Sequence, residues 1–302
     1  MSAIINVREL TKEFGEILAV DHLTFTIGRG EVLGFLGQNG AGKSTTIRLL
    51  LTLIEPTEGE IEIFGLNLKK HRNEILRKTG AIVEKPDLYK YLTALENLRL
   101  FAVLSGITIS EKQLMDQLQK VGLAERAKSK VKTFSQGMKQ RLGIAVALVH
   151  DPELLILDEP MNGLDPQGIA DIRKLIIHLS KEQGKTIFIS SHLLGEIEQI
   201  ADSMLIIDKG KKVADGKVNE LLNPEVTHVE LETESAERMM QLLDKTEWAE
   251  NVKQQDSHKI LLQMKKDRVP GFIRAVGQMD VAVYSVRQKH SLEDYFLSLT
   301  AN

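Results

Sequence analysis

The sequence predicts an α/β protein in which a parallel sheet carries a phosphate-binding loop, followed by a smaller α+β domain. Three observations support this fold class. Residues 37–44 match the pattern G-x-x-x-x-G-K-[ST], which binds phosphate between a strand and a helix. Two apolar runs, at 154–159 and 186–192, end on polar side chains, as buried parallel strands do at a sheet edge. After about residue 223 the chain alternates between short predicted strands and helices.

The composition is that of an ordinary globular protein. The 302 residues suggest about two domains, and 42% of them are hydrophobic and 27% charged. A formal net charge of −3 gives no whole-chain indication of a nucleic-acid partner. The lack of cysteine excludes disulfides and thiolate metal sites. No apolar run approaches the ~18 residues of a spanning helix, so we expect any role at a membrane to depend on another chain.

The phosphate-binding loop follows an apolar run at 31–36 and precedes a helical pattern that begins at 45. Its glycines let the backbone curve around a phosphate, so that N–H groups and the helix N-terminus face the ligand. Lys43 can reach the β- and γ-phosphates, and the Ser44 hydroxyl is a predicted Mg²⁺ ligand. The predicted nucleotide-binding residues of the loop are Gly37, Gln38, Asn39, Gly40, Ala41, Gly42, Lys43, Ser44 and Thr45.

Alternating strands flank the loop. Residues 4–7, 23–27 and 57–66 alternate apolar and polar side chains, which predicts an antiparallel β layer. Phe14, just before a turn, is a candidate to stack on a base, although local sequence favours core packing for it. Residues 80–84 predict a short strand that ends on the carboxylate of Glu84. The pattern from 92 to 149 then predicts a helical subdomain, at about 88–150, whose last helix starts near Ser135.

Two carboxylates follow the predicted strand at 154–157. Asp158 would hold Mg²⁺ directly or through water, and Glu159 is placed to act as a general base. In isolation a turn or helix N-cap explains such a pair equally well, but the upstream phosphate-binding loop makes that the minor interpretation. His192 ends the next predicted strand at the same sheet edge, which favours a role near the γ-phosphate over a structural hydrogen bond. Lys43, Glu159 and His192 are therefore the candidate catalytic residues.

Residues 223–302 form a separate predicted domain, whereas 1–222 carry the chemistry. The order of its predicted elements, β-α-β-β-α-β, indicates a small ferredoxin-like fold, with a closing helix at 292–299. It contains no catalytic constellation. Regulation or dimer contact, on the one hand, and passive covering of an exposed face, on the other, are equally supported interpretations.

Across residues 2–222 the order of these motifs resembles the nucleotide-binding domain of ATP-binding cassette (ABC) transporters. That domain is a P-loop NTPase with a RecA-like core, an antiparallel β layer and a helical subdomain. The loop at 37–44 resembles Walker A and residues 154–158 resemble Walker B. By resemblance, four more residues match family positions, namely the catalytic glutamate, the switch histidine, the D-loop acid and the aromatic that stacks on adenine: Glu159, His192, Asp165 and Phe14. The match reverses the local interpretation of the aromatic residue.

The most diagnostic stretch is Phe-Ser-Gln-Gly-Met-Lys-Gln-Arg at 134–141, which resembles the ABC signature loop. It keeps Ser135 and Gly137, predicted to contact nucleotide, but has Gln136 and Met138 where the common form has Gly and Gln. Glu84 is a further departure, because the family usually has a Gln there that touches Mg²⁺ and the attacking water. A carboxylate can also ligate Mg²⁺, but it brings negative charge close to the phosphates. Glu84 with the two residues after it, together with the signature stretch that begins at Ser135, looks most like the corresponding segments of bacterial exporters of the bacitracin- and lantibiotic-resistance type.

The resemblance implies an ATP-hydrolysing transporter subunit with ATP and Mg²⁺ as ligands. In the family, the signature loop of one cassette completes the ATP site of another, so a second copy or a paralogous subunit is an expected partner. Integral membrane permease subunits are further expected partners, which would place the chain on the cytoplasmic face of the membrane. The expected function is export of an antimicrobial peptide or other drug. The alternative is a soluble ABC ATPase without a membrane partner, such as a cluster-assembly protein.

Overall fold

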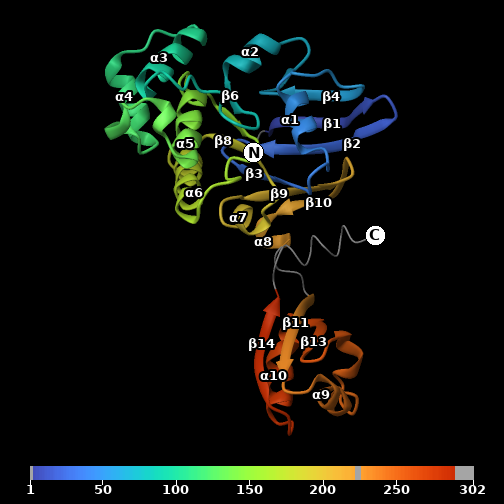
Figure 1. Cartoon of the computed structure of the whole chain (residues 1–302). Helices are drawn as coiled ribbons and strands as arrows, with labels where there is room; N and C mark the ends of the chain where they lie inside the picture. Colours follow the sequence, from blue (N-terminus) through green and yellow to red (C-terminus); the bar gives the residue numbers. More distant parts are fainter. Residues whose placement is uncertain (1–2, 222–225, 290–302) are drawn as a thin grey trace. The chain divides into compact units, whose positions relative to one another are not determined.

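A computed structural model of the chain describes residues 3–221 and 226–289. Contacts divide the chain into two compact units, Met1–Val218 and Asn219–Asn302 (Figure 1). The helix expected at 292–299 lies outside the described residues. Within the described ranges, no helix is both long enough and apolar enough to cross a membrane.

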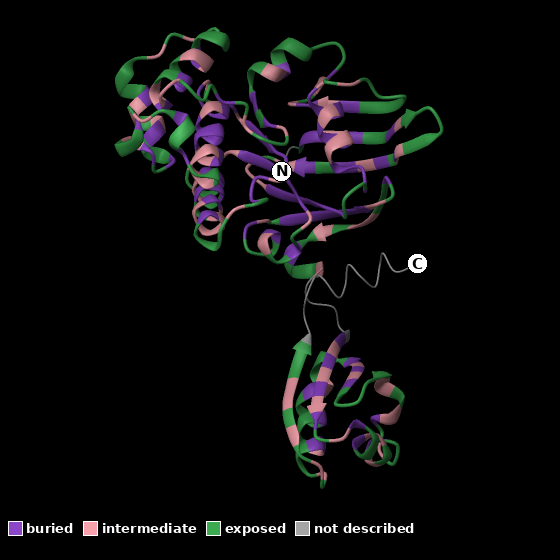
Figure 2. Ribbon diagram, in the orientation of Figure 1, coloured by how far each residue is buried: buried purple, intermediate pink, exposed green. Residues whose placement is uncertain are grey.

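The first unit is built on a six-stranded sheet with the order β10-β9-β3-β8-β7-β6. All neighbours in it are parallel except β10, which closes one edge antiparallel to β9. Its central strands are almost entirely buried, as expected for a sheet covered on both faces (Figure 2). The six strands are β3 (Val32–Leu36), β6 (Thr79–Ile82), β7 (Leu154–Leu157), β8 (Thr186–Ser191), β9 (Ser203–Asp208) and β10 (Lys211–Lys217).

The second sheet of this unit is antiparallel, with the order β2-β1-β4-β5. It confirms the predicted β layer, but its first two strands are longer than the alternating pattern indicated. Register shifts interrupt the pairing of β1 with β2, and Glu9 and His22 have positive φ. The alternation of apolar and polar residues is therefore broken there, although both strands continue. The strands are β1 (Ala3–Phe14), β2 (Ile17–Gly28), β4 (Glu58–Ile63) and β5 (Leu66–Asn67).

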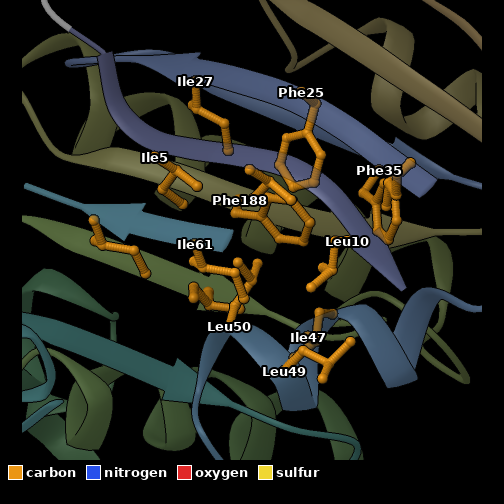
Figure 3. Packing of buried hydrophobic residues seen from close by; sticks show 14 of the residues in the cluster. Ile5, Leu10, Phe25, Ile27, Phe35, Ile47, Leu49, Leu50, Ile61 and Phe188 are labelled. Atoms are coloured by element: carbon orange, nitrogen blue, oxygen red, sulfur yellow. The ribbon is translucent and has the colours of Figure 1, made fainter. Parts of the chain in front are cut away.

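The hydrophobic core of this unit joins both sheets to helix α1 (Lys43–Leu50) (Figure 3). Phe25 of β2 and Phe35 of β3 both contact Phe188 of β8, with ring centroids 6.2 and 5.1 Å apart. Ile47 and Leu50 bury the inner face of α1 in the same cluster. This packing fixes the direction in which the phosphate-binding loop leaves β3 and enters α1.

The predicted helical subdomain is confirmed between β6 and β7. It contains α3 (Ala94–Leu104), α4 (Glu111–Lys120) and α5 (Gln136–Ala147), with two 3-10 turns at Ala124–Arg126 and Val131–Thr133. Each α-helix begins at a hydroxyl residue that accepts a hydrogen bond from a backbone N–H of the first turn, which satisfies a free donor there: Thr93, Ser110 and Ser135. The remaining helices of the unit are α2 (Arg72–Arg77), α6 (Pro166–Lys181), α7 (Leu194–Glu198) and α8 (Val218–Leu221), the last of which spans the boundary between the units.

The second unit has the predicted β-α-β-β-α-β order. Its antiparallel sheet has the order β12-β13-β11-β14, which is that of a ferredoxin-like fold. Trp248 and Phe272 meet edge to face in its core, with centroids 5.4 Å apart. The elements are β11 (Val226–Thr233), α9 (Ala236–Leu243), β12 (Val252–Gln255), β13 (Lys259–Lys265), α10 (Val269–Gly277) and β14 (Val283–Lys289), with 3-10 turns at Ala249–Asn251 and Lys266–Arg268.

Burial of His150, between α5 and β7, makes the stability of the first unit depend on pH. The side chain donates from Nε2 to the Thr79 carbonyl oxygen at 3.2 Å, and its Nδ1 is buried without a partner. Burial lowers the pKa of His150 below its usual value of 6.5. The unfolded chain therefore binds a proton at a pH where the folded chain does not, and stability falls as the pH drops below 6.5.

We expect His150→Gln, which keeps an N–H donor but does not titrate, to lessen the drop in melting temperature between neutral and mildly acidic pH. Thermal melts of both proteins across this range measure the effect. His22→Gln is the matched control of opposite sign, because the hydrogen bond to Asp21 raises the pKa of His22, so its stabilisation is present at low pH and lost as the pH rises. An equal or steeper acid-induced drop in His150→Gln would contradict the assignment.

Candidate functional site

The phosphate-binding loop requires glycine at the start of α1. Gly42 caps the helix with φ +105°, a backbone conformation that L side chains rarely adopt. A Cβ atom there would also lie 2.5 Å from the Ala19 carbonyl oxygen of β2. Gly37 is buried, whereas Gln38, Asn39 and Gly40 are exposed, so the outer edge of the loop is open to a ligand. Of the other predicted loop residues, one is buried and two are partly buried: Ala41, Ser44 and Thr45.

Lys43 is folded into the loop that precedes it. Its side chain is only 7% exposed, and its Nζ donates to the carbonyl oxygens of Gly37 and Gln38 at 2.7 and 3.2 Å. The same Nζ lies 3.3 Å from Glu159 Oε1, which is an ion-pair distance. The loop therefore holds one buried positive charge where phosphate is expected, balanced by carbonyl dipoles and one carboxylate.

Asp158 lies at the end of β7, on the sheet edge next to the loop. It is 1% exposed, and its N–H donates to the Ile82 carbonyl oxygen of β6 at 2.9 Å. Ser190 on the neighbouring strand β8 donates its hydroxyl to Asp158 Oδ1 at 2.6 Å. The second carboxylate oxygen, Oδ2, is buried without a hydrogen-bond partner. An unpartnered buried anionic oxygen is costly, and its natural partner is a cation.

Glu159 follows in a left-handed backbone conformation, with φ +48°. Its N–H donates to Ser190 Oγ at 2.9 Å, and its Oε2 accepts a hydrogen bond from His192 Nδ1 at 2.8 Å. Lys43 lies near the other carboxylate oxygen, Oε1. The Glu159 carboxylate is therefore held between Lys43 and His192, which are far apart in the sequence. The structure thus brings together the three predicted catalytic residues.

One cavity of about 430 Å³ contains the metal-binding and acidic candidates. Its walls come from α1, α5 and the segments that follow β6 and β7: Ser44, Glu84, Lys85, Gln136, Gln140, Asp158, Glu159, Asn162 and Gly163. Gln140 was missed by the sequence analysis. It is 4% exposed, and its Nε2 has no protein partner. A polar residue on the buried face of a predicted helix was the only available signal.

Glu84 does not end a strand, which corrects the prediction. Strand β6 stops at Ile82, and Glu84 has φ +62°, so the backbone leaves extended geometry before the carboxylate. The side chain is exposed and pairs with the Arg48 guanidinium of α1 at 2.5 Å. The segment after β6 lies close against α5 at Gly143. A Cβ atom at that position would lie 2.6 Å from Pro86, so glycine is what permits the close approach. Glu84 lines the cavity, but its carboxylate is directed to Arg48.

Four predicted nucleotide contacts lie outside that cavity, three at exposed positions and Gly137 at a partly buried one. Ser135 caps α5 and accepts from the Met138 N–H at 3.3 Å, while Gly137 lies in the first turn of that helix. Asp165 caps α6 by accepting from the Gly168 N–H at 3.0 Å. Phe14 is 48% exposed at the β1–β2 turn, with Lys12 Nζ 5.0 Å from its ring centroid. Its exposed ring suits a stacking role rather than the core position that local sequence favoured.

A glycine loop between a buried strand and a helix, with a lysine, two acids and a histidine at the same sheet edge, defines a P-loop nucleotide hydrolase. Comparison with known proteins narrows this class. Residues 20–162 match the family model described as ABC transporter. The bacitracin transport ATP-binding protein of Bacillus licheniformis is 57% identical over 212 residues, which cover 70% of this chain and 69% of that protein.

Other relatives extend the match. The bacitracin transport ATP-binding protein of Enterococcus faecalis is 37% identical over 99% of this chain and 97% of its own length. A lantibiotic transport ATP-binding protein of Streptococcus pyogenes is 42% identical over 74% of this chain and 97% of its own length. A solved dimeric ATP-binding cassette, in a post-hydrolysis state with ADP and Pi, superposes with a TM-score of 0.64 at 27% identity, over 71% of this chain and 98% of that one. The chain belongs to the ATP-binding proteins of the ABC transporter family; it binds ATP and is an ATPase.

Proposed function

We propose that the chain energises export of an antimicrobial peptide of the bacitracin or lantibiotic kind, through separate membrane subunits. The similarity to bacitracin and lantibiotic transport proteins supports the substrate class. The meeting of Lys43, Asp158, Glu159 and His192 beside the phosphate-binding loop carries the proposal that hydrolysis provides the energy. ATP would lie on the loop, with its adenine on the exposed ring of Phe14.

Mg²⁺ fits the donors present at this site. Among the described residues, no cluster of three or more His, Cys, Asp or Glu side chains can hold a metal ion. Mg²⁺ needs no such cluster, because it is usually bound by one or two carboxylates, water and the substrate phosphates. The Ser44 hydroxyl and the unpartnered Asp158 Oδ2 line one cavity and would hold the ion, with Glu84 as a further ligand if it leaves Arg48. The bound ion would neutralise phosphate charge.

The residues of the chain divide the remaining work. Lys43 would exchange the carbonyl oxygens of Gly37 and Gln38 for phosphate oxygens, which are stronger acceptors. That movement would release Glu159 from its ion pair, leaving its carboxylate to accept a proton from the attacking water. His192, which donates to Glu159 Oε2, would keep the carboxylate oriented.

A second cassette, either another copy or a paralogous subunit, would complete the site. Ser135 is exposed and Gly137 partly buried at the N-terminus of α5, where a hydroxyl and free backbone N–H groups can bind a γ-phosphate. Asp165 begins α6 at a comparably exposed position. Two ATP molecules would be held between two such surfaces, so that binding closes the dimer and hydrolysis reopens it.

The membrane subunits would dock on the stretch after Glu84, at about 85–101, and keep the chain at the cytoplasmic face of the membrane. Tyr89 and Tyr91 are 54% and 79% exposed there. Large exposed aromatic side chains are typical of protein interfaces. The role of the second unit would be regulation or dimer contact.

Expression of this chain together with any integral membrane proteins encoded by neighbouring genes, in a bacitracin-sensitive bacterium, tests the function. We expect the minimal inhibitory concentration of bacitracin to rise several-fold, and no increase with Lys43→Ala in place of the native chain. Purification from detergent-solubilised membranes should recover the chain with its membrane subunits. An ATPase that is active but never recovered with a membrane protein would indicate the soluble alternative, and unchanged resistance with an intact complex would exclude this substrate.

A further inference from the structure

The hydroxyl of Ser190 forms a hydrogen bond with each of the two acids of the site. It is fully buried at the end of β8, between Asp158 and Glu159. Leu157 of β7 pairs with Ile189 of β8 in parallel register, so the residues that follow them, Asp158 and Ser190, lie side by side at the sheet edge. No pattern in the sequence links them, because they are separated by 32 positions.

We propose that Ser190 is a positioning residue for ATP hydrolysis, which assigns the two oxygens of Asp158 to different partners and anchors the backbone of Glu159. This inference rests on the proposed roles of the two acids. A serine hydroxyl has one proton to donate and lone pairs to accept. Both are used here, because the hydroxyl donates to Asp158 Oδ1 at 2.6 Å and accepts from the Glu159 N–H at 2.9 Å.

The first bond determines which oxygen faces the cation. Because Oδ1 of Asp158 is occupied by Ser190, the buried and unpartnered Oδ2 is left for Mg²⁺. A carboxylate without this restraint can rotate and share its charge between both oxygens. Residues that orient a metal ligand in this way typically alter metal affinity or activity by about 10–100-fold when removed.

The second bond holds the Glu159 backbone in its left-handed conformation. A positive φ is unfavourable for a residue with a Cβ atom, so it persists only where surrounding contacts fix it. The bond to Ser190 Oγ is such a contact, and it places the Glu159 side chain where Lys43 and His192 reach it. Alanine at position 190 would leave the Glu159 N–H without its acceptor and Asp158 Oδ1 without its donor.

Ser190→Ala in the full-length chain tests the inference, with Ser190→Thr as the variant that keeps the hydroxyl. Ser191→Ala is the matched control, because the Ser191 hydroxyl accepts from the Leu193 N–H, at 2.9 Å, whereas the bonds to Asp158 and Glu159 come from Ser190. The readouts are the kcat and KM for ATP, and the affinity of the protein–ADP complex for Mn²⁺, measured from the electron paramagnetic resonance signal of the free ion. The Mn²⁺ measurement does not require turnover.

We expect Ser190→Ala to lower kcat by about 10–100-fold and to weaken Mn²⁺ binding by about tenfold or more. Its affinity for ADP without metal should remain within about twofold, because the phosphate-binding loop is untouched; this measurement also shows that the variant folds. Ser190→Thr should recover most of both losses, and Ser191→Ala should resemble the native chain.

Native kcat and Mn²⁺ affinity in Ser190→Ala would overturn the inference, as would equal losses in Ser190→Ala and Ser191→Ala. If Ser190→Ala and Ser190→Thr both lose metal-free ADP binding, Ser190 is a packing residue and the inference also fails. Failure of the proposed role of Glu159 has a different signature, namely native turnover in Glu159→Gln, and failure of the proposed export function appears only as unchanged bacitracin resistance.

Discussion

Glu159→Gln is expected to lower the rate of ATP hydrolysis by at least about 100-fold, because general-base catalysis contributes about 10²–10⁴-fold. The amide has nearly the same shape as the carboxylate, but it cannot accept a proton from water. Its carbonyl oxygen can still accept from His192 Nδ1, as Oε2 of Glu159 does at 2.8 Å. The site should therefore stay assembled, so that ATP binds, is not hydrolysed and holds the chains in a dimer. Phosphate release and size-exclusion chromatography with ATP measure the two effects.

Glu182→Gln is the matched control for this change. Glu182 lies at the end of α6, with its side chain 71% exposed beside His178, and should tolerate the same substitution with turnover within about twofold of the native rate. Turnover in Glu159→Gln at the native rate would remove Glu159 from the role of base. Loss of ATP binding in the same variant would instead show that Glu159 is needed to hold the loop.

Lys43→Ala is expected to abolish hydrolysis and to weaken ATP binding by about 10–100-fold. A charge-assisted hydrogen bond is worth about 1.5–3 kcal/mol, and each 1.4 kcal/mol corresponds to about tenfold in affinity. The substitution removes the buried cation that binds the Gly37 and Gln38 carbonyl oxygens at 2.7 and 3.2 Å. It also removes the lysine that pairs with Glu159, so the uncompensated carboxylate charge repels the phosphates of ATP. Titration with a fluorescent ATP analogue measures the affinity.

Lys112→Ala, on the exposed surface of α4, is the matched control and should bind and hydrolyse ATP as the native chain does. Lys43→Arg separates charge from shape. It keeps the positive charge, but its planar guanidinium is larger than an ammonium group and has to fit a buried position. We expect it to bind ATP better than Lys43→Ala. Native ATP affinity in Lys43→Ala would refute the assignment of the phosphate-binding loop.

Local sequence was sufficient for the parts of the site that are continuous in the chain. Residues 37–44 are predictable because the glycines, the lysine and the flanking strand and helix lie within one short segment. Asp158, Glu159 and His192 follow apolar runs, and parallel strands deliver the residues after them to one sheet edge. The order of elements in the second unit was predictable for a related reason, since each hydrophobic repeat is local.

The path of the chain after β6 was not predictable from the sequence. An apolar run that includes Val83 reads as a continuing strand, but the strand ends at Ile82 and Glu84 adopts a positive φ. The reason is tertiary, because Pro86 packs against Gly143 of α5 and Arg48 of α1 pairs with the carboxylate. The resemblance to ABC cassettes showed that Glu84 is unusual, but only the structure shows the arginine beside it.

The sequence by itself thus determined the class of protein, through the order of its motifs, and the phosphate-binding loop and candidate catalytic acids, each of which follows from residues that are neighbours in the chain. Only the tertiary structure decided how those groups are connected. The strand order β10-β9-β3-β8-β7-β6 and the register of β7 on β8 place Ser190 beside Asp158 and Glu159. The loop that follows β3 brings Lys43 to the Glu159 carboxylate. Such contacts depend on the alignment of strands far apart in sequence, and that alignment is set by packing of the whole core rather than by any local pattern.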